Sequence, residues 1–226
     1  MKIGIFDSGW DGLKVLKKIK EKVDFADIIY YGDYKKSKEE KNYSVNIGNF
    51  FIDNRVDIII VICNSNVDEL LKFLQEQFSC IPIIGVMSPG ILKAMKESKS
   101  KKIGIFNNSQ LVKSNFNINI LNKLNSDTCY FENLENLKEI PVDIDTVIVD
   151  SFIECKEENI KFIDITEEIA LYVLFYLNRL SLKNGYKKIE KSKIIIDYFI
   201  TGNLEKFKKI SENLLNEKLD NIYITI

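Results

Sequence analysis

A cysteine at the end of an apolar run is the residue best suited to chemistry in this chain. Residues 56–62 read VDIIIVI and are followed by Cys63, Asn64, Ser65 and Asn66. Buried parallel strands read as such aliphatic runs, and α/β proteins place their ligand sites at the carboxyl ends of these strands. A thiol has an ordinary pKa of about 8.5, so Cys63 can exchange a proton near neutral pH. A small buried hydrophobic residue is the alternative interpretation of Cys63, and its position at a strand end favours the reactive one.

The absence of histidine restricts what can act beside this thiol. The 226-residue chain contains no His, which excludes Ser–His–Asp triads and most zinc sites. Cys63, Cys80, Cys129 and Cys155 have no CxxC spacing, so we predict reduced thiols and no metal site. The glycine-containing segment DSGWDG matches neither phosphate-binding nor dinucleotide-binding patterns, and we predict no cofactor.

The composition is that of an ordinary globular protein. The chain is 46% hydrophobic and 29% charged, with a net charge of −1. Lysine-rich segments such as LKKIKEK alternate with apolar residues at helical spacing, which indicates solvated helix faces and no nucleic-acid partner. No apolar run reaches the roughly 18 residues that a membrane span needs, and the N-terminus reads as a strand rather than a signal peptide. We therefore expect a cytoplasmic protein with no membrane segment.

Several segments recur in the same order along the chain. KIGIF occurs at residues 2–6 and again at residues 102–106. The later segments DIIIVICNSN and DTVIVDSFIE also correspond, so that Cys63 and Ser151 occupy the same position in each. A weaker third pair is IPIIGV and IKFIDI. Chance similarity is the alternative, but the shared order favours an internal duplication.

Helix-like segments separate these strands, which predicts βαβ units and parallel sheets. We therefore predict an α/β fold with two pseudo-symmetric domains, mainly parallel sheets, flanking helices and an active-site cleft between the domains. The residues that follow the repeated strands would face this cleft. They are Asp7, Ser8, Cys63, Asn64 and Ser65 from one side, and Asn107, Asn108, Ser109, Ser151 and Phe152 from the other.

Two opposed groups that flank one carbon suit an isomerisation by two acid/bases. One group removes a proton from the carbon, and the opposite group returns a proton to the other face. A thiolate suits this task because a protein can lower its pKa into the working range. Serine suits it poorly, because its hydroxyl is hardly ionised near neutral pH. The repeat thus predicts Cys63 opposite a weak partner, Ser151.

The chain resembles glutamate racemase, within the aspartate/glutamate racemase superfamily. IGIFDSGWDGLKVLKKI is similar to the N-terminal signature of the family, and YYGD, VICNSN and IPIIGVMSPG follow in the family order. KKIGIF resembles the start of its second domain, and DYFITGNLEKFKKISENLL resembles its closing strand and helix. The resemblance covers nearly the whole chain. It implies that the C-terminal segment completes the first domain, with bounds of 1–94 plus 201–226 for the first domain and 95–200 for the second.

The resemblance also implies roles for individual residues. Cys63 would be one of two acid/base thiols, and Asp7 would assist it. Asn64 and Ser65 would hold the carboxylate or ammonium group of the amino acid. The implied substrate-binding positions are Ser8, Asn64, Ser65, Asp33 and Phe152.

The second half of the predicted site departs from the family. Where the family has Gly-Cys-Thr-His, this chain has Asp150, Ser151, Phe152 and Ile153. Loss of one acid/base group typically costs roughly 10²–10⁴-fold in rate. We therefore expect weak or one-sided racemisation. Cys155 lies in the same segment and is a reserve candidate for the missing thiol.

Two functions follow as alternatives. The first is a cofactor-independent amino-acid racemase that interconverts L- and D-glutamate for peptidoglycan precursors, with a degraded second half-site. The second is a catalytically silent racemase-like scaffold that binds a small carboxylate or a protein partner. The predicted ligand is in either case a small amino acid or carboxylate. Glutamate and aspartate both stay open as substrates, and a homodimer is one of the open oligomeric states.

Overall fold

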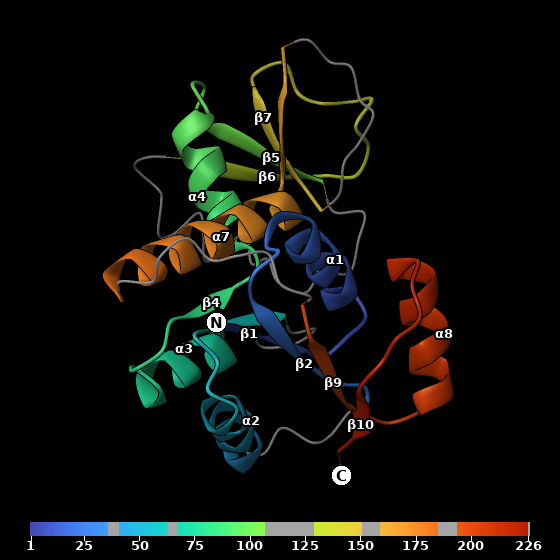
Figure 1. Cartoon of the computed structure of the whole chain (residues 1–226). Helices are drawn as coiled ribbons and strands as arrows, with labels where there is room; N and C mark the ends of the chain where they lie inside the picture. The colour runs from blue at the N-terminus through green and yellow to red at the C-terminus, as the bar shows by residue number, and fades with distance from the viewer. Residues whose placement is uncertain (36–40, 63–66, 107–128, 151–158, 185–193, 226) are drawn as a thin grey trace. The chain divides into compact units, whose positions relative to one another are not determined.

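The chain forms two compact α/β units in the computed structural model (Figure 1). One unit comprises residues 1–85 and 170–226, and the other comprises residues 86–169. Our predicted domain bounds of 1–94 plus 201–226 and 95–200 differ from these limits and stay a prediction. The structure describes residues 1–35, 41–62, 67–106, 129–150, 159–184 and 194–225.

The first unit is built on a parallel sheet of six strands in the order β10-β9-β2-β1-β3-β4. The central strands are buried along almost their whole length, which explains their continuous aliphatic sequences. The strands are β1 (Lys2–Asp7), β2 (Asp27–Asp33), β3 (Ile58–Ile62), β4 (Ile83–Gly85), β9 (Ile196–Thr201) and β10 (Ile222–Ile224).

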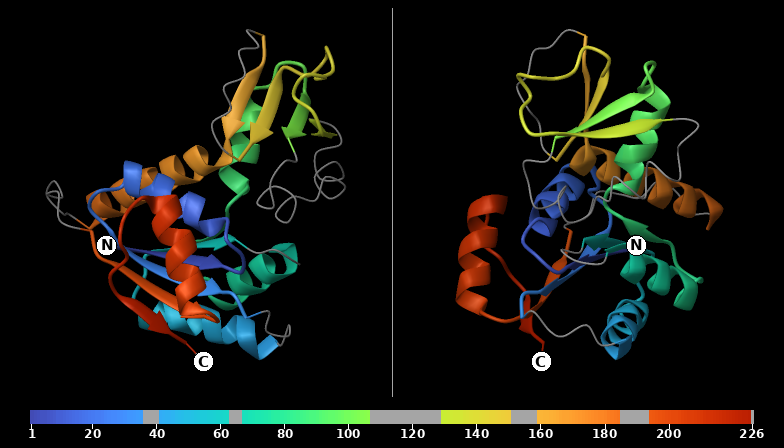
Figure 2. Two further views of the ribbon diagram at one scale, coloured as in Figure 1. Left: turned by 90° about the vertical axis from the view of Figure 1, so that its right-hand side faces the viewer. Right: turned by 180° about the vertical axis from the view of Figure 1, so that it is seen from behind.

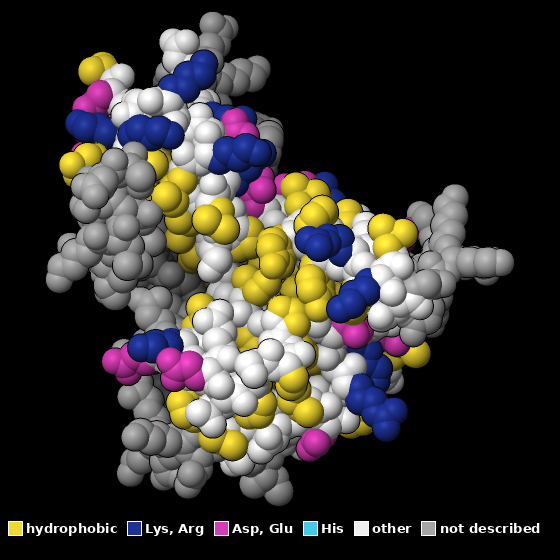
Figure 3. Space-filling view, turned by 90° about the vertical axis from the view of Figure 1, so that its left-hand side faces the viewer, with side chains coloured by type: hydrophobic (Ala, Val, Ile, Leu, Met, Phe, Trp, Pro, Cys, Tyr) yellow, Lys and Arg dark blue, Asp and Glu magenta, His cyan; other side chains and the backbone are white. Residues whose placement is uncertain are grey.

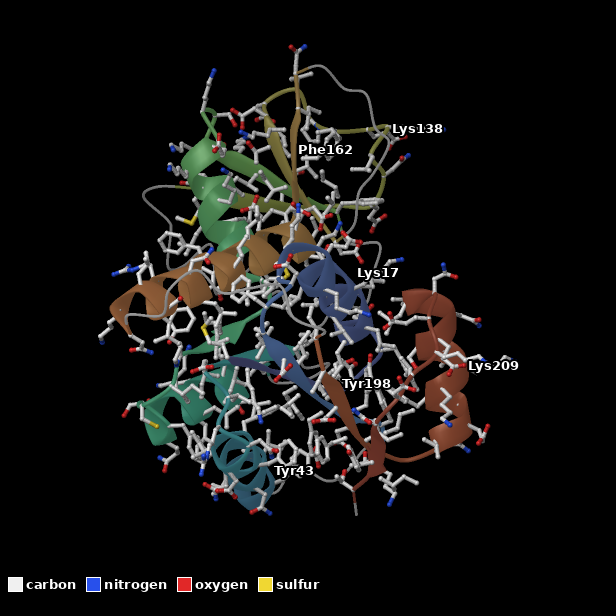
Figure 4. All side chains as sticks on the ribbon, viewed as in Figure 1. Lys17, Tyr43, Lys138, Phe162, Tyr198 and Lys209 are labelled. Carbon is white, nitrogen blue, oxygen red and sulfur yellow. The ribbon has the colours of Figure 1, made fainter. Side chains whose placement is uncertain are left out.

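Helices cover both faces of this sheet (Figures 1 and 2). On one face, α2 (Lys41–Asp53) and α3 (Val67–Gln77) pack over a core that includes Phe6, Ile29 and Ile59. On the other face, α1 (Gly12–Lys22) and α8 (Leu204–Leu215) lie side by side. The ammonium group of Lys17 on α1 (Figure 4) donates a hydrogen bond of 3.1 Å to the carbonyl of Leu214, near the end of α8. A cation near the C-terminus of a helix interacts favourably with the helix dipole.

The second unit contains a parallel sheet of four strands in the order β6-β5-β7-β8. Its strands are β5 (Lys102–Phe106), β6 (Tyr130–Leu134), β7 (Thr146–Val149) and β8 (Lys161–Asp164). Helix α4 (Ser88–Glu97) belongs to this unit. Helix α7 (Ile165–Lys183) begins in this unit and ends in the first.

The predicted repeat is confirmed at the level of strand register. The order β2-β1-β3-β4 of the first sheet corresponds to β6-β5-β7-β8 of the second. Ile3 lies opposite Ile58 in the first sheet, and Ile103 lies opposite Thr146 in the second. These are the pairs that superposing the repeated segments requires. Four strands of the first sheet therefore correspond in order to the four strands of the second, and the repeated segments have the same register.

The weaker third pair of segments follows the same rule. Ile59 lies opposite Ile83 in the first sheet, and Val147 lies opposite Phe162 (Figure 4) in the second. IPIIGV and IKFIDI thus provide equivalent strands at equivalent registers. Sequence similarity this low would not establish the relation without the register.

An apolar stripe is exposed along α7 (Figure 3). Exposed apolar stripes of this kind are typical of interaction surfaces. The stripe consists of Leu171, Tyr172, Phe175 and Leu182. A homodimer stays a prediction. No helix among the described residues is long and apolar enough to cross a bilayer.

Helix α8 begins with a side-chain cap that we expect to contribute to stability. The Asn203 side chain accepts a hydrogen bond of 2.8 Å from the backbone N–H of Lys206. Replacing Asn203 with alanine should lower the free energy of unfolding by about 1 kcal/mol, measured by chemical denaturation. Asn203→Asp keeps an acceptor at the cap and serves as the control. An equal loss in both variants would contradict the capping role.

Candidate active site

Asp7 is the last residue of β1 and lies at the rim formed by the carboxyl ends of the parallel strands. It lies opposite Gly32 of β2 and Ile62 of β3. The backbone N–H of Ser8 donates a hydrogen bond of 3.0 Å to the carbonyl of Ile62. Ligand sites of open α/β sheets form at this end of the strands. Cys63 is the residue after Ile62, and it therefore follows directly on the end of β3.

Three donors hold the Asp7 carboxyl, which is fully buried. The Tyr30 hydroxyl donates to Oδ2 at 2.6 Å, and the backbone N–H of Gly12 donates to the same oxygen at 3.1 Å. The backbone N–H of Gly9 donates to Oδ1 at 2.9 Å. A Cβ at Gly12 would lie 2.6 Å from the carboxyl carbon, so only glycine permits this approach of α1. The glycines of the DSGWDG segment thus hold a carboxyl rather than a phosphate.

Burial raises the pKa of Asp7 from its usual 3.8 to about 7. Desolvation is the largest cause, and the nearby Asp11 carboxylate acts in the same direction. The hydrogen bonds from Tyr30, Gly9 and Gly12 oppose it by stabilising the ionised form. A carboxyl with a pKa near neutrality can both accept and release a proton at physiological pH.

Two tyrosines extend the contacts of this carboxyl. The hydroxyl groups of Tyr30 and Tyr34 lie 3.0 Å apart, and the ring of Tyr34 stacks on Trp10 with 4.1 Å between ring centroids. The sequence pattern does not single out Tyr30 or Tyr34. The available signal was a tyrosine inside a buried strand, since a buried tyrosine hydroxyl usually has a hydrogen-bond partner.

Asp33 ends β2 and anchors the segment that follows it. Its Oδ1 accepts a hydrogen bond from the Thr201 hydroxyl, which comes from the end of β9. The same Thr201 oxygen accepts hydrogen bonds of 2.9 Å from the backbone of Tyr34 and 3.0 Å from that of Lys35. These contacts position Tyr34. The predicted contact of Asp33 with a substrate stays a prediction, as does that of Ser8.

The other predicted site residues lie outside the described part of the chain. The last described residue before the second half-site is Asp150, which follows β7. The roles predicted for these residues therefore stay predictions. They are Cys63, Asn64 and Ser65 after β3, Asn107, Asn108 and Ser109 after β5, Ser151 and Phe152 after β7, and the reserve candidate Cys155. Among the described cysteines, Cys80 is exposed and Cys129 is buried, and both are free thiols. In the described ranges, no group of His, Cys, Asp or Glu could hold a metal ion.

A surface hollow of about 510 Å³ lies at the end of the second sheet where β7 and β8 begin. Thr146 and Lys161 line it, and each begins its strand. The hollow therefore lies at the amino ends of β7 and β8, whereas ligands of such sheets bind at the carboxyl ends. We assign it no role in catalysis.

Comparisons with known proteins agree with the fold. The chain is 30% identical to glutamate racemase of Fusobacterium nucleatum over 257 residues, which covers 97% of this chain and 96% of that protein. It is 43% identical to glutamate racemase of Hydrogenobaculum over 122 residues, about half of each chain (51% and 47%). No family model matches the chain.

Solved structures show the same architecture. Glutamate racemase of Aquifex pyrophilus has a TM-score of 0.70 and 27% identity, covering 99% of this chain and 98% of that one. The RacE1 isoform of glutamate racemase from Bacillus anthracis has a TM-score of 0.71 and 23% identity, covering 99% and 97%. The chain belongs to the glutamate racemase family.

Proposed function

We propose that this protein exchanges the α-proton of glutamate without a cofactor, with Cys63 as the acid/base group that contacts the carbon. The position of Asp7 is the observation that supports this most strongly. Asp7 is a buried carboxyl with a pKa of about 7 and lies opposite Ile62, the residue before Cys63. A carboxylate of this basicity can take the proton of a thiol with an ordinary pKa of about 8.5 at small cost. The resulting thiolate would remove the α-proton, and the thiol would return it.

Glutamate is the substrate that the family suggests. One structural neighbour, glutamate racemase of Francisella tularensis, is described in complex with D-glutamate, and that of Escherichia coli with L-glutamate. Supply of D-glutamate for peptidoglycan precursors is the corresponding cellular role. The racemase-like scaffold without chemistry is the less favoured alternative, because the Asp7 carboxyl retains its three donors and near-neutral pKa.

We further propose that the exchange is one-sided. Ser151 and Cys63 hold the same position in the repeated segments, and the matched registers of the strands before them support this correspondence. A serine hydroxyl is a poor acid/base near neutral pH, so protonation from the second face would be slow. One enantiomer should therefore exchange its α-proton much faster than it is converted into the other.

Incubation in deuterated water tests this proposal. The purified protein is mixed separately with L-glutamate, D-glutamate and the two aspartates. Proton NMR follows loss of the α-proton signal, and chiral chromatography follows interconversion. We expect deuterium in one enantiomer of glutamate at a rate that exceeds net interconversion. Equal exchange of both enantiomers with full racemisation would contradict the one-sided site, and absence of exchange with every substrate would contradict the proposed function.

A further inference from the structure

We propose that Tyr30 and Tyr34 are positioning residues whose hydroxyls form a hydrogen-bonded chain ending on Asp7, and that this chain orients the carboxyl and sets its protonation. The inference rests on the proposed function for its catalytic meaning. The contacts among Tyr30, Tyr34 and Asp7 all lie within the described part of the chain. Neither tyrosine contacts a substrate in this proposal, because each acts through Asp7.

Elementary chemistry fixes the direction of the chain. A tyrosine hydroxyl has one proton. When Asp7 is ionised it can only accept, so Tyr30 must donate its proton to Asp7 Oδ2 across 2.6 Å. The Tyr30 oxygen is then an acceptor, and the hydroxyl of Tyr34 must donate to it across 3.0 Å. Burial, together with the negative charge of Asp7, raises the pKa of both tyrosines well above the usual range, so both keep the protons that the chain needs.

The outer member of the chain is held from several segments. The Tyr34 ring stacks on the Trp10 ring. The ammonium group of Lys206 on α8 lies over the same Trp10 ring, 5.5 Å from its centroid. The backbone N–H of Tyr34 donates to the Thr201 hydroxyl. Ring, backbone and hydroxyl of Tyr34 are thus each fixed by a different contact, which keeps its hydroxyl directed at Tyr30.

The inner member is packed in an aromatic cluster. The Tyr30 ring centroid lies 5.8 Å from that of Tyr198 and 6.3 Å from that of Phe207. The hydroxyl of Tyr198 (Figure 4) is buried and has no hydrogen-bond partner among the described residues. Tyr198 therefore shares the packing of Tyr30 but not its link to Asp7, which makes it a matched control.

The electrostatic surroundings of Asp7 determine the sign of the expected effect. A donor to the ionised form lowers a carboxyl pKa, and the Tyr30 hydroxyl is the largest such contribution at Asp7. Removing this donor must raise the pKa further. Among the described residues, several charged, titratable or donor groups act on Asp7. They are Tyr30 of β2, Tyr34 after β2, Asp11 before α1, and the backbone N–H groups of Gly9 and Gly12. On the other side, β3 places the apolar Ile62 opposite Asp7.

The pKa of Asp7 can be measured without any activity. Protein labelled with ¹³C at the aspartate carboxyl carbon is titrated by NMR, and the Asp7 signal is assigned by its loss in Asp7→Asn. We expect Tyr30→Phe to raise the Asp7 pKa by about one unit or more, and Tyr34→Phe to raise it less. Tyr198→Phe should leave it unchanged. Circular dichroism checks that each variant is folded, and Tyr34→Phe decides the matter if Tyr30→Phe does not fold.

The possible outcomes separate this proposal from the proposed function. An unchanged Asp7 titration in both Tyr30→Phe and Tyr34→Phe would overturn the hydroxyl chain. A shift in Tyr198→Phe as large as that in Tyr30→Phe would also overturn it, because packing rather than hydrogen bonding would then set the pKa. In active protein, the acidic limb of the pH profile for exchange should move to higher pH in Tyr30→Phe by the shift measured by NMR. Absence of exchange in the unmodified protein would overturn the proposed function, and the titration would still decide the chain.

Discussion

Replacing Cys63 with alanine is expected to reduce α-proton exchange on glutamate by at least roughly 10²–10⁴-fold. Alanine has no group that can accept the α-proton, and Asp7 is expected to act on the thiol rather than on carbon. Cys63→Ser should lose a similar factor, because its hydroxyl has too high a pKa to ionise beside a carboxyl of pKa about 7. The rate is measured as loss of the α-proton NMR signal in deuterated water, for the enantiomer that exchanges in the unmodified protein.

Cys80 offers a matched control for this experiment. Its thiol is free and exposed, so Cys80→Ser removes one sulfur without disturbing a core. This variant should exchange at the rate of the unmodified protein. Full exchange in Cys63→Ala would show that another group removes the proton, and Cys155 would then be the first thiol to replace.

Stability should depend on pH through Asp7, and Asp7→Asn should remove this dependence. In the folded chain the pKa of Asp7 is about 7, whereas the usual pKa of an aspartate, which applies to the unfolded chain, is 3.8. Between these values the folded protein holds a proton that the unfolded chain has released. The stabilisation from the protonated carboxyl is therefore complete below about pH 4 and is lost as the pH rises through about 7. The shift corresponds to about 4 kcal/mol at most.

Chemical denaturation at several pH values between 4 and 8 measures this effect. The free energy of unfolding of Asp7→Asn, minus that of the unmodified protein, should rise from pH 4 to pH 7 and then level off. Glu97 and Asp145 have pKa values lowered to about 2, and because both proteins contain them their effects cancel in the difference. Asp220→Asn removes an exposed carboxylate and serves as the control for the loss of a surface charge. A constant difference between Asp7→Asn and the unmodified protein would contradict a raised pKa at Asp7.

The central strands were predictable because each of them carries its own aliphatic signal. KIGIF identified both β1 and β5, and the repeated segments, which follow in the same order, have matching registers in the two sheets. Asp7 was predictable because it directly follows such a run. The role proposed for Asp7 comes from the family resemblance, because the strand signal alone does not indicate one.

The contacts around Asp7 could not be predicted, because they join residues that are distant in sequence. Tyr34 is anchored by Thr201, 167 positions later in the chain. The segment DYFIT contains no pattern that indicates which strand it pairs with. The predicted second domain, 95–200, accordingly included most residues of β9. In the structure, β9 pairs along its length with β2. The need for glycine at position 12 likewise depends on a carboxyl that approaches it only in the folded chain.

The pairing of β9 with β2 has a consequence for the synthesis of the protein. While the chain emerges from the ribosome, the edge of β2 has no partner, and the Tyr30 ring lacks Tyr198 and Phe207, until the last part of the message has been translated. The second sheet needs only residues 102–164 and can form earlier. The surroundings of the Asp7 carboxyl are thus among the last parts of the molecule to be completed, and a prematurely terminated chain would carry Asp7 and Cys63, the residues proposed for catalysis, without the contacts that hold the Asp7 carboxyl.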